Sequence, residues 1–132
     1  MNRIVMIDDN PMEHFIAVKL LKNVGLFGNS KHVTNGYETL QYIKDNLQNQ
    51  HELPDVILLD INMPDIDAWG FLDQYKALQQ QITKPIDIYI ITSSIDADDM
   101  LKAKSYPLVK SYLVKPLSKD VLVKIHDDCG KV

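Results

Sequence analysis

Two short apolar segments in this chain each run directly into acidic residues, and this feature constrains the fold more than any other. Ile4 to Ile7 is followed by Asp8 and Asp9, and Val56 to Leu59 is followed by Asp60. Continuous apolar runs of this length are typical of strands that are buried on both faces of a parallel sheet. Ligands bind outside the carboxyl ends of such strands, so we expect the acids at a binding edge rather than inside the core.

Strand-like and helix-like segments alternate along the whole chain. The expected strands are Arg3 to Asp8, Lys31 to Thr34, Asp55 to Asp60, Ile86 to Thr92 and Lys110 to Val114. Helices are expected after the N-cap residues Asn10, Asn35, Asp96 and Ser118, and from Ala68 to Gln81. This alternation predicts an α/β fold, with a five-stranded parallel sheet that is doubly wound by five helices.

Apolar spacing indicates which helix faces meet the sheet. In the first helix, one stripe recurs every four residues and consists of Met12, Ile16, Leu20 and Val24. In the third helix, the residues expected to be buried are Phe71, Leu72, Tyr75 and Leu78.

Length and charge exclude several classes of protein. The chain has 132 residues, and we expect one domain over 1–132 with no output domain. The net charge of -4 argues against a nucleic-acid or anionic-membrane partner, since either would favour a basic face. The chain contains no apolar run of about 18 residues and no signal-peptide pattern at its start, and its one cysteine, Cys129, fits a reducing compartment. These features predict a cytoplasmic protein.

Two further polar residues are expected at the same sheet edge as the acids. Thr92 ends the fourth expected strand, and Lys115 follows the fifth. Three carboxylates in one pocket repel each other unless a cation neutralises them. Their oxygen ligands select a hard ion, and Mg²⁺ is the best candidate. A lysine ammonium and a threonine hydroxyl can both bind phosphate, and a carboxylate can act as a nucleophile towards phosphorus.

Histidine gives no comparable signal. The four histidines, His14, His32, His51 and His126, are scattered along the chain. We interpret them as surface or capping residues rather than as ligands of a zinc ion.

Four blocks together resemble the receiver domains of response regulators in two-component signalling, of the single-domain type similar to chemotaxis regulators. The blocks are the pair Asp8-Asp9, "LLDINMPDID" around Asp60, "IITSS" with Thr92, and "YLVKP" with Lys115. The resemblance covers essentially the whole chain and implies a flavodoxin-like sheet of strand order 2-1-3-4-5.

The resemblance implies a role for each acid. Asp60 matches the phosphoacceptor, which receives a phosphoryl group from a phosphohistidine of a sensor histidine kinase or histidine phosphotransfer protein. Asp9 matches the direct Mg²⁺ ligand, and Asp8 matches the acid that holds the ion mainly through water. The backbone carbonyl of Asn62 matches a further metal ligand.

The resemblance also implies a switch. Lys115 matches the lysine that pairs with Asp60 and then with the phosphoryl group, and Pro116 matches a proline that follows it through a cis bond. Thr92 matches the switch hydroxyl and Tyr112 the switch aromatic, although simple strand packing of Tyr112 stays open. Phosphorylation would reshape the face of the fourth helix, fifth strand and fifth helix for a downstream protein target, and a homodimer through this face is left open.

Two positions depart from the family pattern. Ala68 stands where the family usually has glycine, so we expect a different or strained turn before the third helix. The stretch between Asp9 and Asp60 is longer than expected, and we place the extra length in "LQNQHELPD", residues 47–55.

Three other functions agree less well with the sequence than a phosphoaccepting switch does. A Mg²⁺-dependent phosphohydrolase of the haloacid dehalogenase type needs an acid two residues after the nucleophile, where this chain has Asn62. A degenerate receiver that only binds a partner disagrees with the complete set of Asp8, Asp9, Thr92 and Lys115. A two-domain DNA-binding regulator is disfavoured by the length of the chain.

Overall fold

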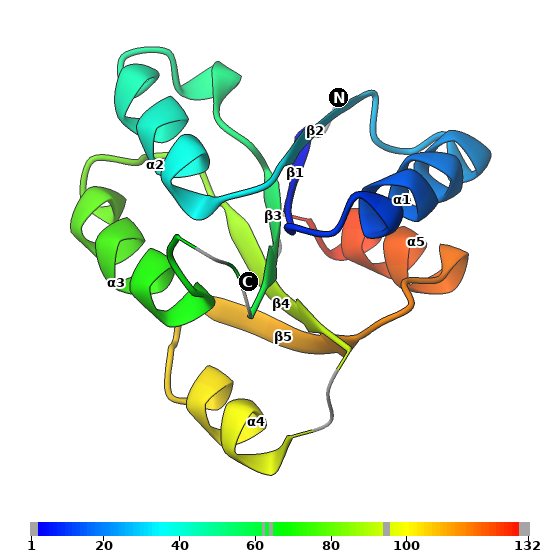
Figure 1. Cartoon of the computed structure of the whole chain (residues 1–132). Helices are drawn as coiled ribbons and strands as arrows, with labels where there is room; N and C mark the ends of the chain where they lie inside the picture. The colour runs from blue at the N-terminus through cyan, green and yellow to red at the C-terminus, as the bar shows by residue number, and fades with distance from the viewer. Residues whose placement is uncertain (1–2, 62, 64, 94–95, 130–132) are drawn as a thin grey trace.

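The fold is a five-stranded parallel sheet in a computed structural model that describes residues 3–61, 63, 65–93 and 96–129 (Figure 1). The strands are β1 (Arg3–Ile7), β2 (Asn29–Val33), β3 (Val56–Asp60), β4 (Asp87–Thr92) and β5 (Val109–Val114). They lie in the order β2-β1-β3-β4-β5, and every neighbouring pair is parallel. The predicted fold class and strand order are confirmed.

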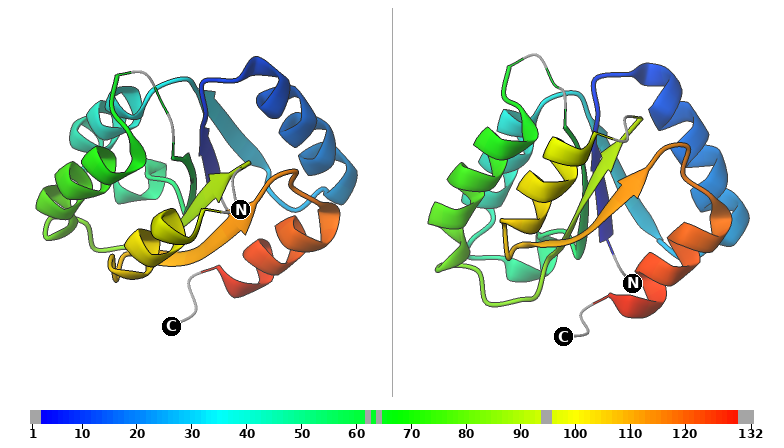
Figure 2. Two further views of the ribbon diagram at one scale, coloured as in Figure 1. Left: turned by 60° about the horizontal axis from the view of Figure 1, so that its bottom comes forward. Right: turned by 90° about the horizontal axis from the view of Figure 1, so that it is seen from below.

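Helices cover both faces of the sheet. They are α1 (Pro11–Val24), α2 (Gly36–Asp45), α3 (Ala68–Gln79), α4 (Ala97–Lys104) and α5 (Lys119–Asp128). Helices α1 and α5 pack on one face, and α2, α3 and α4 lie on the other (Figures 1 and 2). None of the helices in the described part of the chain has the length and apolar composition of a membrane span.

All four predicted N-caps are confirmed. The side chains of Asn10, Asn35, Asp96 and Ser118 accept hydrogen bonds from backbone N–H groups in the first turns of α1, α2, α4 and α5. Each cap satisfies a donor that the helix itself leaves unpaired, which contributes about 1 kcal/mol. These local signals therefore fix where the helices begin after the strands.

The sheet supplies the centre of the core. All five residues of β3 are buried, including the terminal Asp60, because β3 is covered by helices on both faces. Helix α3 buries the four residues expected of it, Phe71, Leu72, Tyr75 and Leu78. Burying such side chains contributes roughly 1.5–3 kcal/mol each, so the central strands form a rigid frame beneath their polar ends.

The predicted apolar face of α1 is wrong in its first turn. Met12 is 60% exposed, whereas Ala17 and Leu21 are the buried residues of this helix. Residues four apart in an α-helix are separated by 400°, so a stripe at this spacing turns around the helix by about 40° per step. A stripe that begins at Met12 therefore reaches the core side only towards its other end, where Leu20 packs partly buried.

The expected strain at Ala68 is absent. Ala68 is the first residue of α3, is fully buried, and donates its N–H to the carbonyl of Ile61 at 3.2 Å. Among the described residues, no residue other than glycine has a positive φ. Alanine therefore fits at position 68, because Ala68 itself needs no left-handed conformation.

Gln50 is one of the residues that anchor the loop before β3. It contains a short 3₁₀ helix, η1 (Gln50–Glu52), where the sequence predicts a loop. The amide nitrogen of Gln50 donates to the carbonyls of Leu47 and Gln81 at 2.9 and 3.0 Å, and its amide oxygen accepts from the backbone N–H of Thr83 at 2.8 Å. The extra residues are thus tied to the loop between α3 and β4.

Replacing Gln50 tests this anchor. We expect Gln50→Ala to lower the free energy of unfolding by roughly 1–2 kcal/mol, because several backbone groups lose a partner. Gln41→Ala is the matched control, since Gln41 is exposed and its side chain bonds only to Asp45 among the described contacts. Urea unfolding of both variants measures the difference. Equal stabilities would show that Gln50 is not an anchor.

Candidate functional site

The predicted site residues meet at one edge of the sheet. Asp8 follows β1, Asp60 ends β3, Thr92 ends β4 and Lys115 follows β5. Strands β1 and β3 are neighbours, and the chain leaves β1 to build β2 on one side and β3 on the other. The acids therefore lie at the topological switch point, where open parallel sheets bind ligands.

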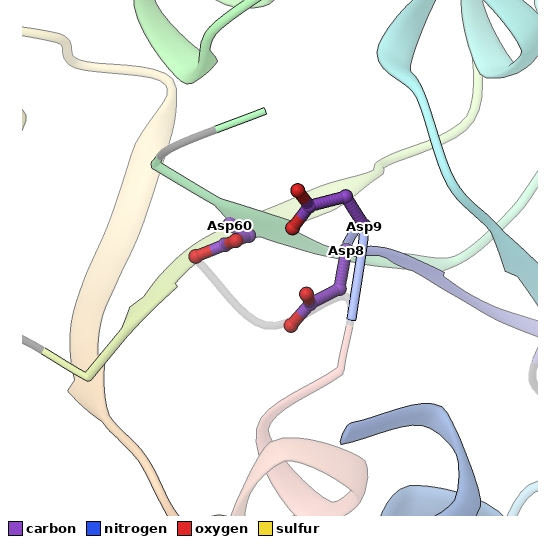
Figure 3. A group of neighbouring side chains, drawn as sticks. All are labelled: Asp8, Asp9 and Asp60. Atoms are coloured by element: carbon purple, nitrogen blue, oxygen red, sulfur yellow. The ribbon is translucent and has the colours of Figure 1, made fainter. Parts of the chain in front are cut away.

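Three carboxylates form the centre of the site. One carboxylate oxygen from each of Asp8, Asp9 and Asp60 lies within 4.8 Å of the others. Figure 3 shows the side chains converging from the ends of β1 and β3. Asp8 and Asp60 are buried, with 0% and 7% exposure, while Asp9 is exposed. One side of the cluster is thus enclosed by protein, and the other is open to solvent.

Lys115 is the cation nearest to this cluster among the described side chains. Its Nζ lies 2.6 Å from Asp8 Oδ2 and 3.5 Å from Asp60 Oδ1. Burial alone would lower the pKa of Lys115, but the hydrogen bond to Asp8 and the charges of Asp60 and Asp8 raise it. The ammonium therefore stays charged and partly neutralises the two buried acids.

The backbone around Lys115 is also defined. Its N–H donates to the carbonyl of Thr92 at 2.7 Å, which extends the pairing of β4 and β5 by one residue. The following peptide bond, between Lys115 and Pro116, is cis, the geometry that the resemblance implies for this proline.

Asp60 resists ionisation in this environment. Burial, then the negative charge of Asp8, raise the pKa of Asp60 from 3.8 to about 6, although Lys115 acts in the opposite direction. A carboxyl group perturbed in this way by burial and by a neighbouring charge is a candidate functional group. A divalent cation at the cluster would favour the ionised form.

Asp8 is held more firmly than Asp9. Its N–H donates to the carbonyl of Val33 at 3.1 Å, and its Oδ1 accepts from the N–H of Asn10 at 2.9 Å. In the described part of the chain, no hydrogen bond or ion pair holds the side chain of Asp9. Asn62, the remaining expected metal ligand, lies outside the described residues.

The two expected switch residues lie beside each other on adjoining strands. Thr92 is buried, with 2% exposure, and Tyr112 on β5 is half-buried. Burial and the negative charge of Asp99 raise the pKa of Tyr112, and a side-chain hydrogen bond with Thr92 partly offsets this. The hydroxyl at the end of β4 is therefore connected to the edge strand.

Two of the four histidines contact each other, which the sequence did not indicate. His51 is exposed, and His126 on α5 is half-buried. His14 on α1 and His32 on β2 are also half-buried. Their Nδ1 atoms lie 3.0 Å apart, and His14 Nε2 lies 2.6 Å from the backbone oxygen of Asp8. Their spacing along the chain gave no sign of this contact, because it depends on how α1 packs beside β2.

The pKa of Asp60 predicts the pH dependence of stability. Between its ordinary value near 3.8 and about 6, the folded protein keeps a proton that the unfolded chain has released. The free energy of unfolding of the metal-free protein should therefore fall as the pH rises through this window. We expect Asp60→Asn to raise it by roughly 1–3 kcal/mol at pH 8 and to change it little at pH 4.

Urea unfolding in EDTA at both pH values measures this effect. Asp65→Asn is the matched control, because Asp65 is an exposed aspartate in the loop that follows the site. The same change for Asp60→Asn at both pH values would contradict the raised pKa.

The protein-family model of the response regulator receiver domain matches residues 4–127 of this chain. A probable methanogenesis regulatory protein of Methanothrix harundinacea, FilR2, is 29% identical over 115 residues, which cover 87% of this chain and 72% of that protein. PilH of Pseudomonas aeruginosa is 27% identical over 124 residues, which cover 94% of this chain and 93% of PilH.

Solved structures agree with the family match. A two-component response regulator from Cytophaga hutchinsonii superposes with a TM-score of 0.86 at 25% identity, covering 97% of this chain and 96% of that one. The Mn²⁺-bound form of response regulator Rcp1 has a TM-score of 0.72 at 20% identity, covering 97% and 91%, and shares the fold. The family match reaches from β1 to α5 and includes the three clustered acids, and the chain therefore belongs to the response regulator receiver domain family of two-component signalling.

Proposed function

We propose that this chain is a phosphoaccepting signalling switch. In this proposal, Asp60 accepts a phosphoryl group from a phosphohistidine of a sensor histidine kinase or of a histidine phosphotransfer protein. The observation that supports it most is the convergence of Asp8, Asp9 and Asp60 within 4.8 Å, with the Lys115 ammonium 3.5 Å from Asp60. Receiver-family membership supports the same chemistry.

Transfer needs a nucleophile and neutralisation of charge. A carboxylate oxygen of Asp60 forms a bond to phosphorus while the bond from phosphorus to the donor imidazole nitrogen breaks. The leaving imidazole nitrogen keeps the electron pair, and the ring takes up a proton from solvent to become neutral histidine. Lys115 lies close enough to Asp60 to pair with the transferred oxygens, and the Thr92 hydroxyl can donate a hydrogen bond to them. Such transfers depend mainly on positioning and on electrostatic stabilisation.

The donor set fits a hard divalent cation. Asp8, Asp9 and Asp60 provide only carboxylate oxygens, which suit Mg²⁺ or Mn²⁺ rather than zinc. The Mn²⁺-bound form of the similar regulator Rcp1 supports a divalent ion, and we propose Mg²⁺, held by Asp9 and Asp60 directly and by Asp8 mainly through water. Bound there, the ion would neutralise the charge that develops on the phosphoryl oxygens.

The output is proposed to be a protein contact. Phosphorylation of Asp60 would draw the Thr92 hydroxyl towards the phosphoryl group and change its contact with Tyr112. This shift would favour one of two arrangements of the face formed by α4, β5 and α5. A downstream protein or a second copy of the chain would bind that face.

Because ATP supplies kinase phosphoryl groups, we propose that this switch acts in the cytoplasm.

Intact-mass spectrometry tests the phosphoacceptor. We expect acetyl phosphate to add one phosphoryl group to the wild-type protein in the presence of Mg²⁺, and none in EDTA. Asp60→Asn should add none, whereas the control Asp65→Asn should behave as the wild type. An unmodified wild-type protein, with both acetyl phosphate and a phosphohistidine donor, would favour a module that only binds a partner.

Lys115→Met separates metal binding from transfer. The variant leaves the buried carboxylate of Asp8 without its ammonium partner, so we expect the metal-free protein to lose about 3 kcal/mol of stability. Mg²⁺ should bind it at least as tightly as the wild type, because one competing cation is gone. Phosphorylation should slow at least about tenfold, because a charge that stabilises the transferred group is lost.

Calorimetric Mg²⁺ titration and phosphorylation time courses measure both effects. Lys119→Met is the control, because Lys119 is exposed at the start of α5. Weaker Mg²⁺ binding by Lys115→Met would contradict the assigned role of the ammonium.

A further inference from the structure

A pair of histidines lies behind the acidic cluster and has no part in the function proposed above. His14, in the first turns of α1, and His32, on β2, meet edge to face with ring centroids 5.0 Å apart. Their Nδ1 atoms are 3.0 Å apart, and His14 Nε2 is 2.6 Å from the backbone oxygen of Asp8. One histidine therefore contacts the backbone of an acid of the site, and the second contacts the first.

The partners determine which nitrogen carries each proton. A carbonyl oxygen can only accept, so His14 Nε2 must carry the proton that it donates to Asp8. In neutral His14 the Nδ1 atom is then an acceptor, and His32 Nδ1 must be the donor to it. This leaves His32 Nε2 as a lone pair, which agrees with its burial without a hydrogen-bond partner among the described residues. Burial is the largest cause that lowers the pKa of His32, which favours this neutral form.

The hydrogen bond from His14 completes the fixation of Asp8. The N–H, the carbonyl and both carboxylate oxygens of Asp8 each have a partner, provided by Val33, His14, Asn10 and Lys115. The carbonyl of Asp8 belongs to the planar peptide unit that also contains the nitrogen of Asp9. Fixing that oxygen fixes the plane, and with it the direction in which Asp9 leaves the chain.

Asp9 needs this support more than the other acids. Its side chain is exposed and has no hydrogen bond or ion pair within the described ranges, unlike Asp8 and Asp60. Its position relative to Asp8 and Asp60 therefore depends on the backbone that carries it. Groups that orient metal ligands from behind typically change metal affinity 10- to 100-fold when they are removed.

We propose that His14 and His32 are positioning residues for the metal site, with His14 orienting the Asp8–Asp9 peptide and His32 fixing the tautomer of His14. This inference rests on the proposed Mg²⁺ site and adds to it two residues outside the acid, lysine and threonine set. The competing explanation is that the pair only packs α1 against β2. Packing would affect stability, whereas positioning affects Mg²⁺ affinity.

Matched variants separate the two explanations. His14→Phe keeps the bulk of the ring but removes the donor, while His14→Gln offers an amide N–H at the same number of bonds from Cβ. For His32, the corresponding pair is His32→Leu and His32→Asn. His51→Phe is the control, because His51 is exposed in η1.

Calorimetric titration with Mg²⁺ at pH 8 gives the first readout. We expect His14→Phe to raise the Kd for Mg²⁺ about tenfold and His14→Gln to restore it to within about threefold of the wild type. His32→Leu should weaken binding less, His32→Asn should restore it, and His51→Phe should have no effect. A folded His14→Phe variant with wild-type affinity would overturn the positioning role and leave only packing.

Nitrogen-15 NMR of the wild-type imidazoles gives a second readout that needs no variant and no metal. We expect a proton on His14 Nε2 and on His32 Nδ1, and lone pairs on the other two ring nitrogens. The opposite tautomers would overturn the inference even if a variant fails to fold.

If the wild type bound no Mg²⁺, the proposed function would fail and the positioning role with it. If the wild type bound Mg²⁺ and the His14 and His32 variants bound it equally tightly, the positioning role would fail and the proposed function would stand.

Discussion

The structure depends on placing three like charges next to one another at the edge of a parallel sheet. Asp8, Asp9 and Asp60 can meet there because β1 and β3 are neighbours and both end at that edge. Their mutual repulsion is tolerated because Lys115 arrives from the end of β5 and pairs with Asp8. The strand order thus determines which side chains meet at this edge, since β4 carries Thr92 between Asp60 and Lys115.

The balance of charge explains why this site would bind a divalent cation. Three carboxylates facing one ammonium leave about two negative charges when all the groups are ionised. The metal-free protein reduces this imbalance by raising the pKa of Asp60, which keeps a proton at pH values where an ordinary aspartate has lost it. A divalent ion would remove the imbalance and would leave Asp60 ionised as a nucleophile. The stability lost by crowding the acids would then be the source of the affinity for the proposed metal ion.

The features predictable from the sequence are those with local causes. The apolar runs that end in Asp8 and Asp60 located β1, β3 and the site, and the caps Asn10 and Asn35 located α1 and α2. Features that depend on how separate elements approach each other were not predictable. The prediction that the Met12 stripe is one face of α1 failed because residues four apart turn progressively around the helix. The role of Gln50 depends on a loop that follows another helix.

The histidine pair shows the same limit within the site. Nothing in the spacing of His14 and His32 indicates a contact, because it forms only when α1 packs beside β2. The acids, in contrast, follow their strands directly, and the topology of a parallel sheet brings such ends together whatever the loops between them do. Residues that we propose to carry the chemistry were therefore easier to identify than residues that we propose to support them.

A crystal structure with Mg²⁺ and beryllofluoride, a mimic of the phosphoryl group, would test the central claim most directly. We expect beryllofluoride bound to Asp60, a metal ion between Asp9 and Asp60, and Lys115 moved from Asp8 to a fluoride. Beryllofluoride absent from Asp60 at saturating concentration, with Lys115 still 2.6 Å from Asp8, would contradict the account.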